Sequence, residues 1–404
     1  MTTHMSRSLD KRLAQILFML ALLWGILIYA AQIQLFGAHL LSLPSGRFLH
    51  DFAFFWGGAK LLWLGDVARI FDPERFNAWL AGQISPDSMQ MFAKWSYPPT
   101  MLLPLLPFGL LPLPVAFLLW LAVMFALLAT VLHHVIGDAR TVMAVMISPA
   151  ALYSLYVAQN GALTASLLIA GIWLVDRRPL IAGACIGALV IKPQLGIVLP
   201  FALAAGGYWR CFAAAALVAA LILLATIPLV GVAGWSGFLH ATTPAMTAQL
   251  LHAYGIAPQI AMPTTWVTLQ GWGAGPRIAA LGQGLSTLAA IVIVIRAWHL
   301  PHADRTLRNA LTCALPLLAT PFGYVYDAIP VMLAVAIVIR AGFSGQFRWW
   351  ERPVLAGLWT WPALTVPWQF FFHLRPIGAF LLLAFALGLL WRIETFSADC
   401  PRTA

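Results

Sequence analysis

The sequence predicts an all-α polytopic membrane protein with about twelve transmembrane helices, on three observations. First, 62% of the 404 residues are hydrophobic and 9% are charged, whereas soluble domains average about 45–50% apolar and about 25% charged residues. Second, the apolar runs are continuous and long enough to span as helices, unlike the short alternating segments of a transmembrane β-barrel. Third, the basic residues behind the net charge of +10 cluster in short loops between apolar runs. That distribution is typical of membrane topology and argues against nucleic acid as the partner.

The first apolar run, at about 13–31, follows Arg7, Lys11 and Arg12. We therefore expect a retained first span and an N-terminus in the cytoplasm. Further spans are expected at about 113–134, 141–158, 161–175, 179–191, 194–208, 211–232, 277–298, 307–323, 325–341, 353–371 and 376–392. This arrangement puts the loop arginines on the side of the N-terminus. Counts from ten to thirteen spans fit the same pattern, because the stretch 179–208 is interrupted at Lys192-Pro193.

Two segments, at about 32–112 and 233–276, are expected outside the cytoplasm. In the first, residues 52–64 can form a helix with Phe, Trp and Leu on one face, which predicts a helix lying in the membrane interface. Prolines then break the approach to the span at 113–134. The second segment is rich in Gly, Pro, Thr, Trp and His and is expected to be an ordered loop covering a cavity. With no repeat or linker evident, residues 1–404 are interpreted as one domain.

Asp51 stands in the sequence His50-Asp51-Phe52-Ala53-Phe54-Phe55-Trp56, just after the first span. A carboxylate at the membrane surface beside an aromatic run is costly to desolvate, so it needs a partner, water or a function. One interpretation is structural, because Asp is a good N-cap for a helix starting at Phe52. The other is chemical, because a carboxylate can accept a proton from a hydroxyl group.

Lys192 interrupts an apolar region, where it would bind an anion, pair with a carboxylate or reach the surface with its ammonium group. Gln159-Asn160 joins two expected spans, which fits an ordinary turn or a substrate contact. Asp327, in Tyr324-Val325-Tyr326-Asp327, is a second external carboxylate that could instead cap the following helix.

Other external polar residues are Arg277, His373 and Arg375, each of which also fits an interfacial anchor. The histidines lack metal-ligand spacing, and we expect neither a metal site nor a cofactor. The four cysteines, Cys185, Cys211, Cys313 and Cys400, show no CxxC spacing, and those in apolar stretches are expected to be small core residues.

One or two carboxylates with several cations at the external face suit chemistry on an anionic lipid. Cations would hold a phosphate, and a carboxylate would deprotonate an acceptor hydroxyl. This combination predicts glycosyl transfer from a lipid-phosphate sugar. The alternative is a transporter or flippase for a lipid-linked or anionic solute, although such carriers usually have repeated halves, and none is evident.

Several motifs resemble glycosyltransferase family 87, the polyprenol-phosphate-sugar-dependent mannosyltransferases with a GT-C membrane fold. They occur in order over most of the first 210 residues: Asp51-Phe52 with the aromatic-Gly-Ala stretch after it, Asp66 through Ile70-Phe71-Asp72-Pro73, Tyr97-Pro98-Pro99, Gln159-Asn160-Gly161, and Gly183 to Lys192-Pro193. The segment Tyr324–Asp327 matches only loosely, because the family often carries a His there.

The resemblance implies a GT-C-like bundle with interfacial helices in the first external loop. It also implies a catalytic carboxylate at Asp51, inversion at the anomeric carbon and no nucleotide-sugar site. The expected donor is a polyprenyl-phosphate hexose, with mannose as the expected sugar, and the expected acceptor is an extracytoplasmic lipid or glycan. Lys192, Arg277 and Arg375 are expected to bind the donor phosphate. The residues expected to contact substrate are Tyr97, Gln159, Asn160, Tyr326, Asp327 and His373.

These expectations place the protein in a bacterial inner (plasma) membrane, with the active site facing the periplasm or the cell exterior. Another GT-C enzyme, using a pyrophosphate-linked donor or transferring a pentose or aminosugar, fits the same residues.

Overall fold

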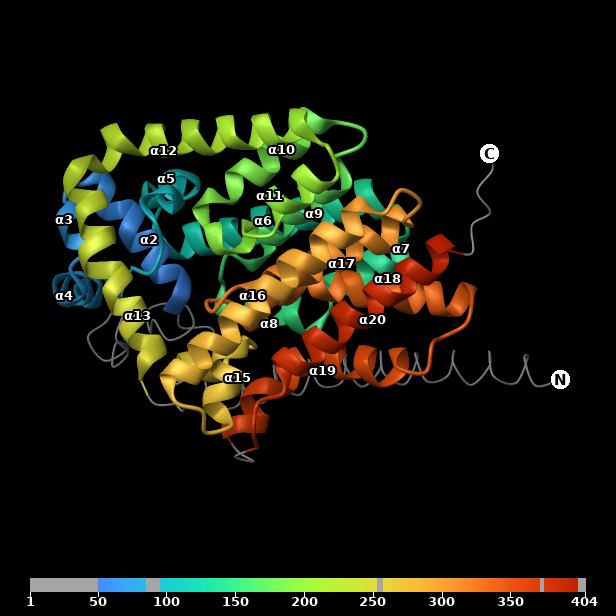
Figure 1. Ribbon diagram of the computed structural model, residues 1–404. Helices are drawn as coiled ribbons and strands as arrows, with labels where there is room; N and C mark the ends of the chain where they lie inside the picture. The colour runs from blue at the N-terminus through green and yellow to red at the C-terminus, as the bar shows by residue number, and fades with distance from the viewer. Residues whose placement is uncertain (1–49, 85–94, 253–256, 371–373, 399–404) are drawn as a thin grey trace.

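The computed structural model of this chain describes residues 50–84, 95–252, 257–370 and 374–398. All regular secondary structure in these residues is helical (Figure 1). The predicted all-α class is therefore confirmed. The expected first span at 13–31, His373 and Cys400 lie outside the described residues.

The helices follow one another without a strand between them in the described segments. The first group is α2 (His50–Trp63), α3 (Val67–Ile70), α4 (Pro73–Ile84), η4 (Pro99–Met101), α5 (Leu102–Gly109), α6 (Leu113–Ile136), α7 (Ala139–Met146), α8 (Pro149–Val157) and α9 (Gly161–Trp173). The second group is α10 (Pro179–Ala188), η5 (Leu189–Ile191), η6 (Pro193–Gly196), α11 (Leu199–Ala205), α12 (Trp209–Gly237), η7 (Phe238–Thr242), α13 (Thr243–Leu251), α14 (Ala257–Ile260) and α15 (Thr265–Gly271). The last group is α16 (Pro276–His299), α17 (Arg305–Ala319), η8 (Val325–Ala328), α18 (Ile329–Ser344), α19 (Glu351–Phe370) and α20 (Gly378–Ala398).

Five helical segments of the described chain are long and apolar enough to cross a membrane: Leu113–Ile136, Trp209–Leu251, Pro276–His299, Val325–Ser344 and Gly378–Thr395. The pair α7 and α8, bent by 47°, makes a sixth if it counts as one span. The stretches expected to span at 161–175, 179–191 and 194–208 form shorter apolar helices. The chain is a multi-pass membrane protein, and a total of about twelve spans stays a prediction.

Helix boundaries follow local sequence signals. Pro114 lies in the first turn of α6, and Gly137 ends this helix in the left-handed conformation with φ of 70°. Asp138 then caps α7 by accepting a hydrogen bond from the backbone N–H of Thr141. Ser148 caps α8 in the same way, and Pro149 follows it. These signals divide the predicted span at 141–158 into two short helices.

Basic residues gather where α16 ends, α17 begins and α20 ends, at one end of the bundle (Figure 1). Ion pairs join these ends: Arg296 Nε lies 2.7 Å from Glu394 Oε1, and Arg392 binds Glu351. Clustering at one end is what the predicted topology requires. We call this the arginine-rich end.

The helix expected at 52–64 exists as α2. Its aromatic side chains pack inside the protein: Phe52 and Phe55 are buried, and their rings lie 5.8 and 5.7 Å from the ring of Trp120 on α6. Gly109 of α5 lets the backbones approach, because a Cβ there would lie 2.7 Å from the carbonyl carbon of Ala59. An interfacial position for α2 stays a prediction.

In the second expected external segment, the described residues 233–252 and 257–276 form mainly helices rather than a loop. The long helix α12 bends at Gly231, whose φ of 61° interrupts it, and the chain then turns through η7 into α13 across the end of the bundle opposite the arginine-rich end (Figure 1). Short helices α14 and α15 follow. The backbone N–H of Val325 donates to the carbonyl of Ala261, which ties the connection between α14 and α15 to η8.

Candidate active site

The Gln159-Asn160-Gly161 turn is held in one conformation by its neighbours. Ala158 ends α8 with φ of 52°, a left-handed conformation that is uncommon for alanine, and its carbonyl accepts a hydrogen bond from the indole of Trp120. Gly161 opens α9 directly against η8, because a Cβ there would lie 2.2 Å from the carbonyl oxygen of Tyr326. The turn is thus strained and closely packed, which is common at functional sites.

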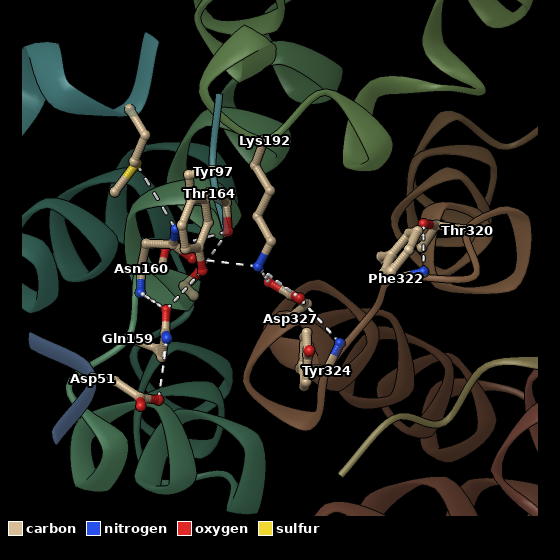
Figure 2. Close-up of polar contacts among 12 residues, drawn as sticks. Asp51, Tyr97, Gln159, Asn160, Thr164, Lys192, Thr320, Phe322, Tyr324 and Asp327 are labelled. Atoms are coloured by element: carbon tan, nitrogen blue, oxygen red, sulfur yellow. Dashed lines mark hydrogen bonds and ion pairs between the residues drawn. The ribbon is translucent and has the colours of Figure 1, made fainter. Parts of the chain in front are cut away.

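Asp51, in the first turn of α2, meets this turn (Figure 2). The amide Nε2 of Gln159 donates to Asp51 Oδ2 at 3.1 Å. The Oε1 atom of the same amide accepts from the hydroxyl of Tyr97 at 2.9 Å. Burial raises the pKa of the Tyr97 phenol well above its usual range, so this hydroxyl stays protonated and acts as the donor. The Gln159 amide is therefore oriented with its NH₂ group toward the carboxylate.

Lys192 lies at the break between η5 and η6, directly before Pro193, with a backbone outside the helical region (φ of −147° and ψ of 69°). Its Nζ lies 2.6 and 2.8 Å from the two carboxylate oxygens of Asp327 and 3.3 Å from Asn160 Oδ1 (Figure 2). The backbone N–H of Tyr324 donates to the Asp327 carboxylate. Of the three interpretations of Lys192, the structure shows pairing with a carboxylate.

The site has an accessible layer and a buried layer. Asp51, Tyr97, Gln159 and Tyr324 are partly exposed. Behind them, Asn160, Lys192, Asp327 and Tyr326 are buried. The ring of Tyr326 stacks on Tyr324 with centroids 5.2 Å apart, and Lys192 Nζ lies 4.6 Å from the Tyr326 centroid. The partly exposed residues can touch a substrate, whereas the buried residues support the partly exposed ones.

Burial raises the pKa of Asp51 from 3.8 to about 6, although the Gln159 hydrogen bond opposes this effect. A carboxyl group with a pKa near neutrality can gain and lose a proton under cellular conditions, as a general base must. Asp51 also interacts electrostatically with five tyrosines, on α8, η8 and the segments before η4 and η8: Tyr97, Tyr153, Tyr156, Tyr324 and Tyr326. Tyr153 and Tyr156 were not predicted, although their spacing puts them on one helix face just before Gln159.

The other two predicted phosphate ligands, Arg277 and Arg375, lie at the start of α16 and just before α20. Arg277 is exposed in the first turn of α16. Arg375 is exposed and lies 5.1 Å from the ring of Trp272, whose indole donates to the carbonyl of Pro376. Both arginines thus flank the connection between α15 and α16, on elements separate from those that carry Asp51 and Lys192.

Among the described residues, Cys211 and Cys313 are buried free thiols, as expected, and Cys185 is partly buried. No group of three His, Cys, Asp or Glu side chains suited to a metal occurs in the described part of the chain.

Residues 95–321, more than half of the chain, match the family described as Glycosyltransferase family 87. No curated protein and no solved structure gives a significant match. The matched segment contains Tyr97, Gln159, Asn160 and Lys192 but begins after Asp51, so the match says nothing about that residue. The motif resemblance is concentrated in the first 210 residues, whereas the match extends to residue 321. A match of this extent favours an enzyme over a transporter, and the chain belongs to glycosyltransferase family 87 as a membrane glycosyltransferase.

Proposed function

We propose that this glycosyltransferase moves a hexose, mannose in the first instance, from a polyprenyl-phosphate donor to an extracytoplasmic lipid or glycan acceptor, with Asp51 as general base. The observation that carries the proposal is a partly exposed carboxylate whose pKa is raised to about 6 by burial. Partly exposed tyrosines around it offer aromatic rings and hydroxyl groups to a sugar.

In the proposed reaction, Asp51 takes the proton of the acceptor hydroxyl as its oxygen attacks the anomeric carbon. The bond between that carbon and the phosphate oxygen breaks, and its electron pair leaves with the polyprenyl phosphate. A single in-line displacement inverts the configuration at the anomeric carbon. Phosphate is a good leaving group when cations neutralise its charge, so no acid catalyst is required.

The donor phosphate needs a cation that substrate can reach. Lys192 is buried and paired with Asp327, so we assign it to support of the Asn160 and Gln159 turn rather than to direct phosphate binding. Arg277 and Arg375 are exposed and remain the candidates for the phosphate. His373 stays a proposed substrate contact, whereas Tyr326 and Asp327 are buried and are assigned to support of the partly exposed residues.

The test is transfer by purified Asp51→Asn protein supplied with labelled polyprenyl-phosphate mannose and cell membranes as the acceptor source. We expect folded protein with transfer reduced by roughly a thousandfold or more, since general-base catalysis contributes about 10²–10⁴-fold. Glu74→Gln is the matched control, because Glu74 is an exposed carboxylate in the first turn of α4. Normal turnover by Asp51→Asn would reject the base assignment. Transfer from another labelled donor, with Asp51 still essential, would correct the sugar alone.

A further inference from the structure

A pocket at the arginine-rich end, away from the Asp51 site, is formed by close packing of α10 on α12. Gly183 and Gly187 are four residues apart on α10, and a Cβ at either would lie 2.5 or 2.4 Å from a backbone carbonyl oxygen of α12. Small residues at this spacing let membrane helices approach closely. Because the contact involves the first turns of α12, it brings the starts of both helices side by side.

The pocket has a volume of about 460 Å³ and is lined by two arginines and an apolar lip: Arg178, Pro179, Leu180, Ile181 and Arg210. Arg178 precedes α10, and Arg210 lies in the first turn of α12. Both arginines are exposed. Arginines at the starts of two neighbouring helices therefore line one small space.

The nearest carboxylate in the sequence, Asp176, is already bound by other groups. Its Oδ2 lies 3.6 Å from Arg308 and 3.8 Å from Arg305, and its Oδ1 accepts from the hydroxyl of Tyr208. Within the described chain, neither Arg178 nor Arg210 forms an ion pair with an acidic side chain. Two like charges share the pocket without a counter-charge, which favours an anion there.

The surroundings of the pocket are those of a lipid rather than of a soluble anion. Leu180 and Ile181 are 67% and 47% exposed, and Trp209, which has the amphipathic ring typical of membrane interfaces, is 62% exposed. Only 11% of the most apolar stretch of the helical segment Trp209–Leu251 is buried inside the protein, and several leucines of α12 are exposed. Acyl chains can therefore lie along α10 and α12 below a phosphate held at the pocket.

We propose that Arg178 and Arg210 form a binding site for an anionic phospholipid, with the phosphate bridging the two guanidinium groups and the acyl chains on the exposed apolar faces of α10 and α12. Basic pockets between membrane helices bind anionic headgroups in this way. The site is independent of the glycosyl-transfer proposal, because it shares no residue with the Asp51 layer.

The experiment measures lipid retention by the purified full-length protein using native mass spectrometry, with titrated cardiolipin, phosphatidylglycerol and phosphatidylcholine. We expect the two anionic lipids to bind more tightly than phosphatidylcholine. The double variant Arg178→Gln/Arg210→Gln should bind them at least about tenfold more weakly, since each basic residue near an anionic surface contributes about fivefold. Arg177→Gln is the matched control, because Arg177 is an exposed neighbour that does not line the pocket.

Inorganic phosphate, tested by thermal shift on the same protein, distinguishes a lipid site from a simple anion site. The proposal requires stabilisation by cardiolipin or phosphatidylglycerol that is lost in the double variant, with little effect of free phosphate at millimolar concentration. Equal lipid retention by wild type and double variant would overturn it. So would an equal loss in Arg177→Gln, or free phosphate that stabilises as strongly as the lipids.

Discussion

The ammonium group of Lys192 lies 2.6 Å from the Asp327 carboxylate, and both side chains are buried. The two residues are 135 positions apart, so this ion pair joins the η5–η6 break to η8. Through Asn160, Lys192 also reaches the turn whose Gln159 amide contacts Asp51. The sequence predicts Lys192 as a phosphate ligand or as the partner of a carboxylate, and Asp327 as a substrate contact or a helix cap. In the structure the two side chains form one internal ion pair.

Lys192→Met should destabilise the protein by about 3–5 kcal/mol, because it leaves the Asp327 carboxylate buried without its cation. The double variant Lys192→Met/Asp327→Leu should recover part of this loss, since it removes both charges. Thermal unfolding of the purified variants in one detergent measures both effects. A single variant as stable as wild type would show that the pair does not organise the fold.

Transfer by the wild-type enzyme should fall as pH drops through about 6, the value to which burial raises the Asp51 pKa. Only the ionised carboxylate can accept a proton, so kcat/KM should decrease about tenfold per pH unit below that value. A profile of kcat/KM from about pH 4.5 to pH 8 measures this fall, the acidic limb of the profile. A rate that is flat across this range would contradict Asp51 as the base.

Gln159→Met should move the acidic limb of that profile to higher pH. The Gln159 hydrogen bond favours the ionised form of Asp51 and so lowers its pKa, and methionine keeps the volume without the donor. A lower transfer rate in Gln159→Met with the acidic limb at the same pH as in wild type would indicate that Gln159 contacts the substrate but does not affect the Asp51 pKa. Asp51→Asn supplies the background, because it has no carboxyl group to titrate.

Asp51→Asn should stabilise the folded protein at neutral pH. The carboxyl pKa is higher in the folded state, at about 6, than its ordinary value of 3.8, so folding is penalised once the group ionises. This penalty is absent below pH 3.8 and fully present above about 6. It amounts to at most about 3 kcal/mol, because each pKa unit corresponds to about 1.4 kcal/mol. Melting temperatures of wild type and variant should thus differ at pH 7.5 and converge near pH 4; equal values at both would refute the penalty.

Gly161→Ala should disrupt the site, because the new Cβ would lie 2.2 Å from the carbonyl oxygen of Tyr326. We expect a loss of about 2 kcal/mol or more in stability and a marked loss of transfer, since backbone must move. Gly284→Ala in α16 is the control, because nothing lies within 4 Å of its Cβ position. That variant should be neutral or slightly stabilising. Equal behaviour of the two variants would show that η8 does not need its close approach to α9.

Composition and the continuous apolar runs together determined the all-α membrane class. A bilayer requires every backbone polar group to be hydrogen-bonded within the protein, and runs of this length do so as helices rather than as barrel strands. Asp51, Gln159, Lys192 and Asp327 were identified individually, since polar residues in so apolar a chain are few. Local sequence could not determine which of them pair. Lys192 could equally have met an anion, water or a carboxylate, and each choice depends on segments far apart in the chain.

The tertiary structure decided three things. It buried Lys192 against Asp327 and left Asp51 partly exposed, which separates the support from the accessible layer. It formed helices in the described parts of the segment 233–276, which was expected to be a loop, because the chain bends at Gly231 and runs on from α12 through η7 into α13. It also placed Arg178 beside Arg210 through glycine contacts between α10 and α12. The sequence by itself determined which polar and charged side chains need a partner, whereas long-range packing decided which partner each of them has.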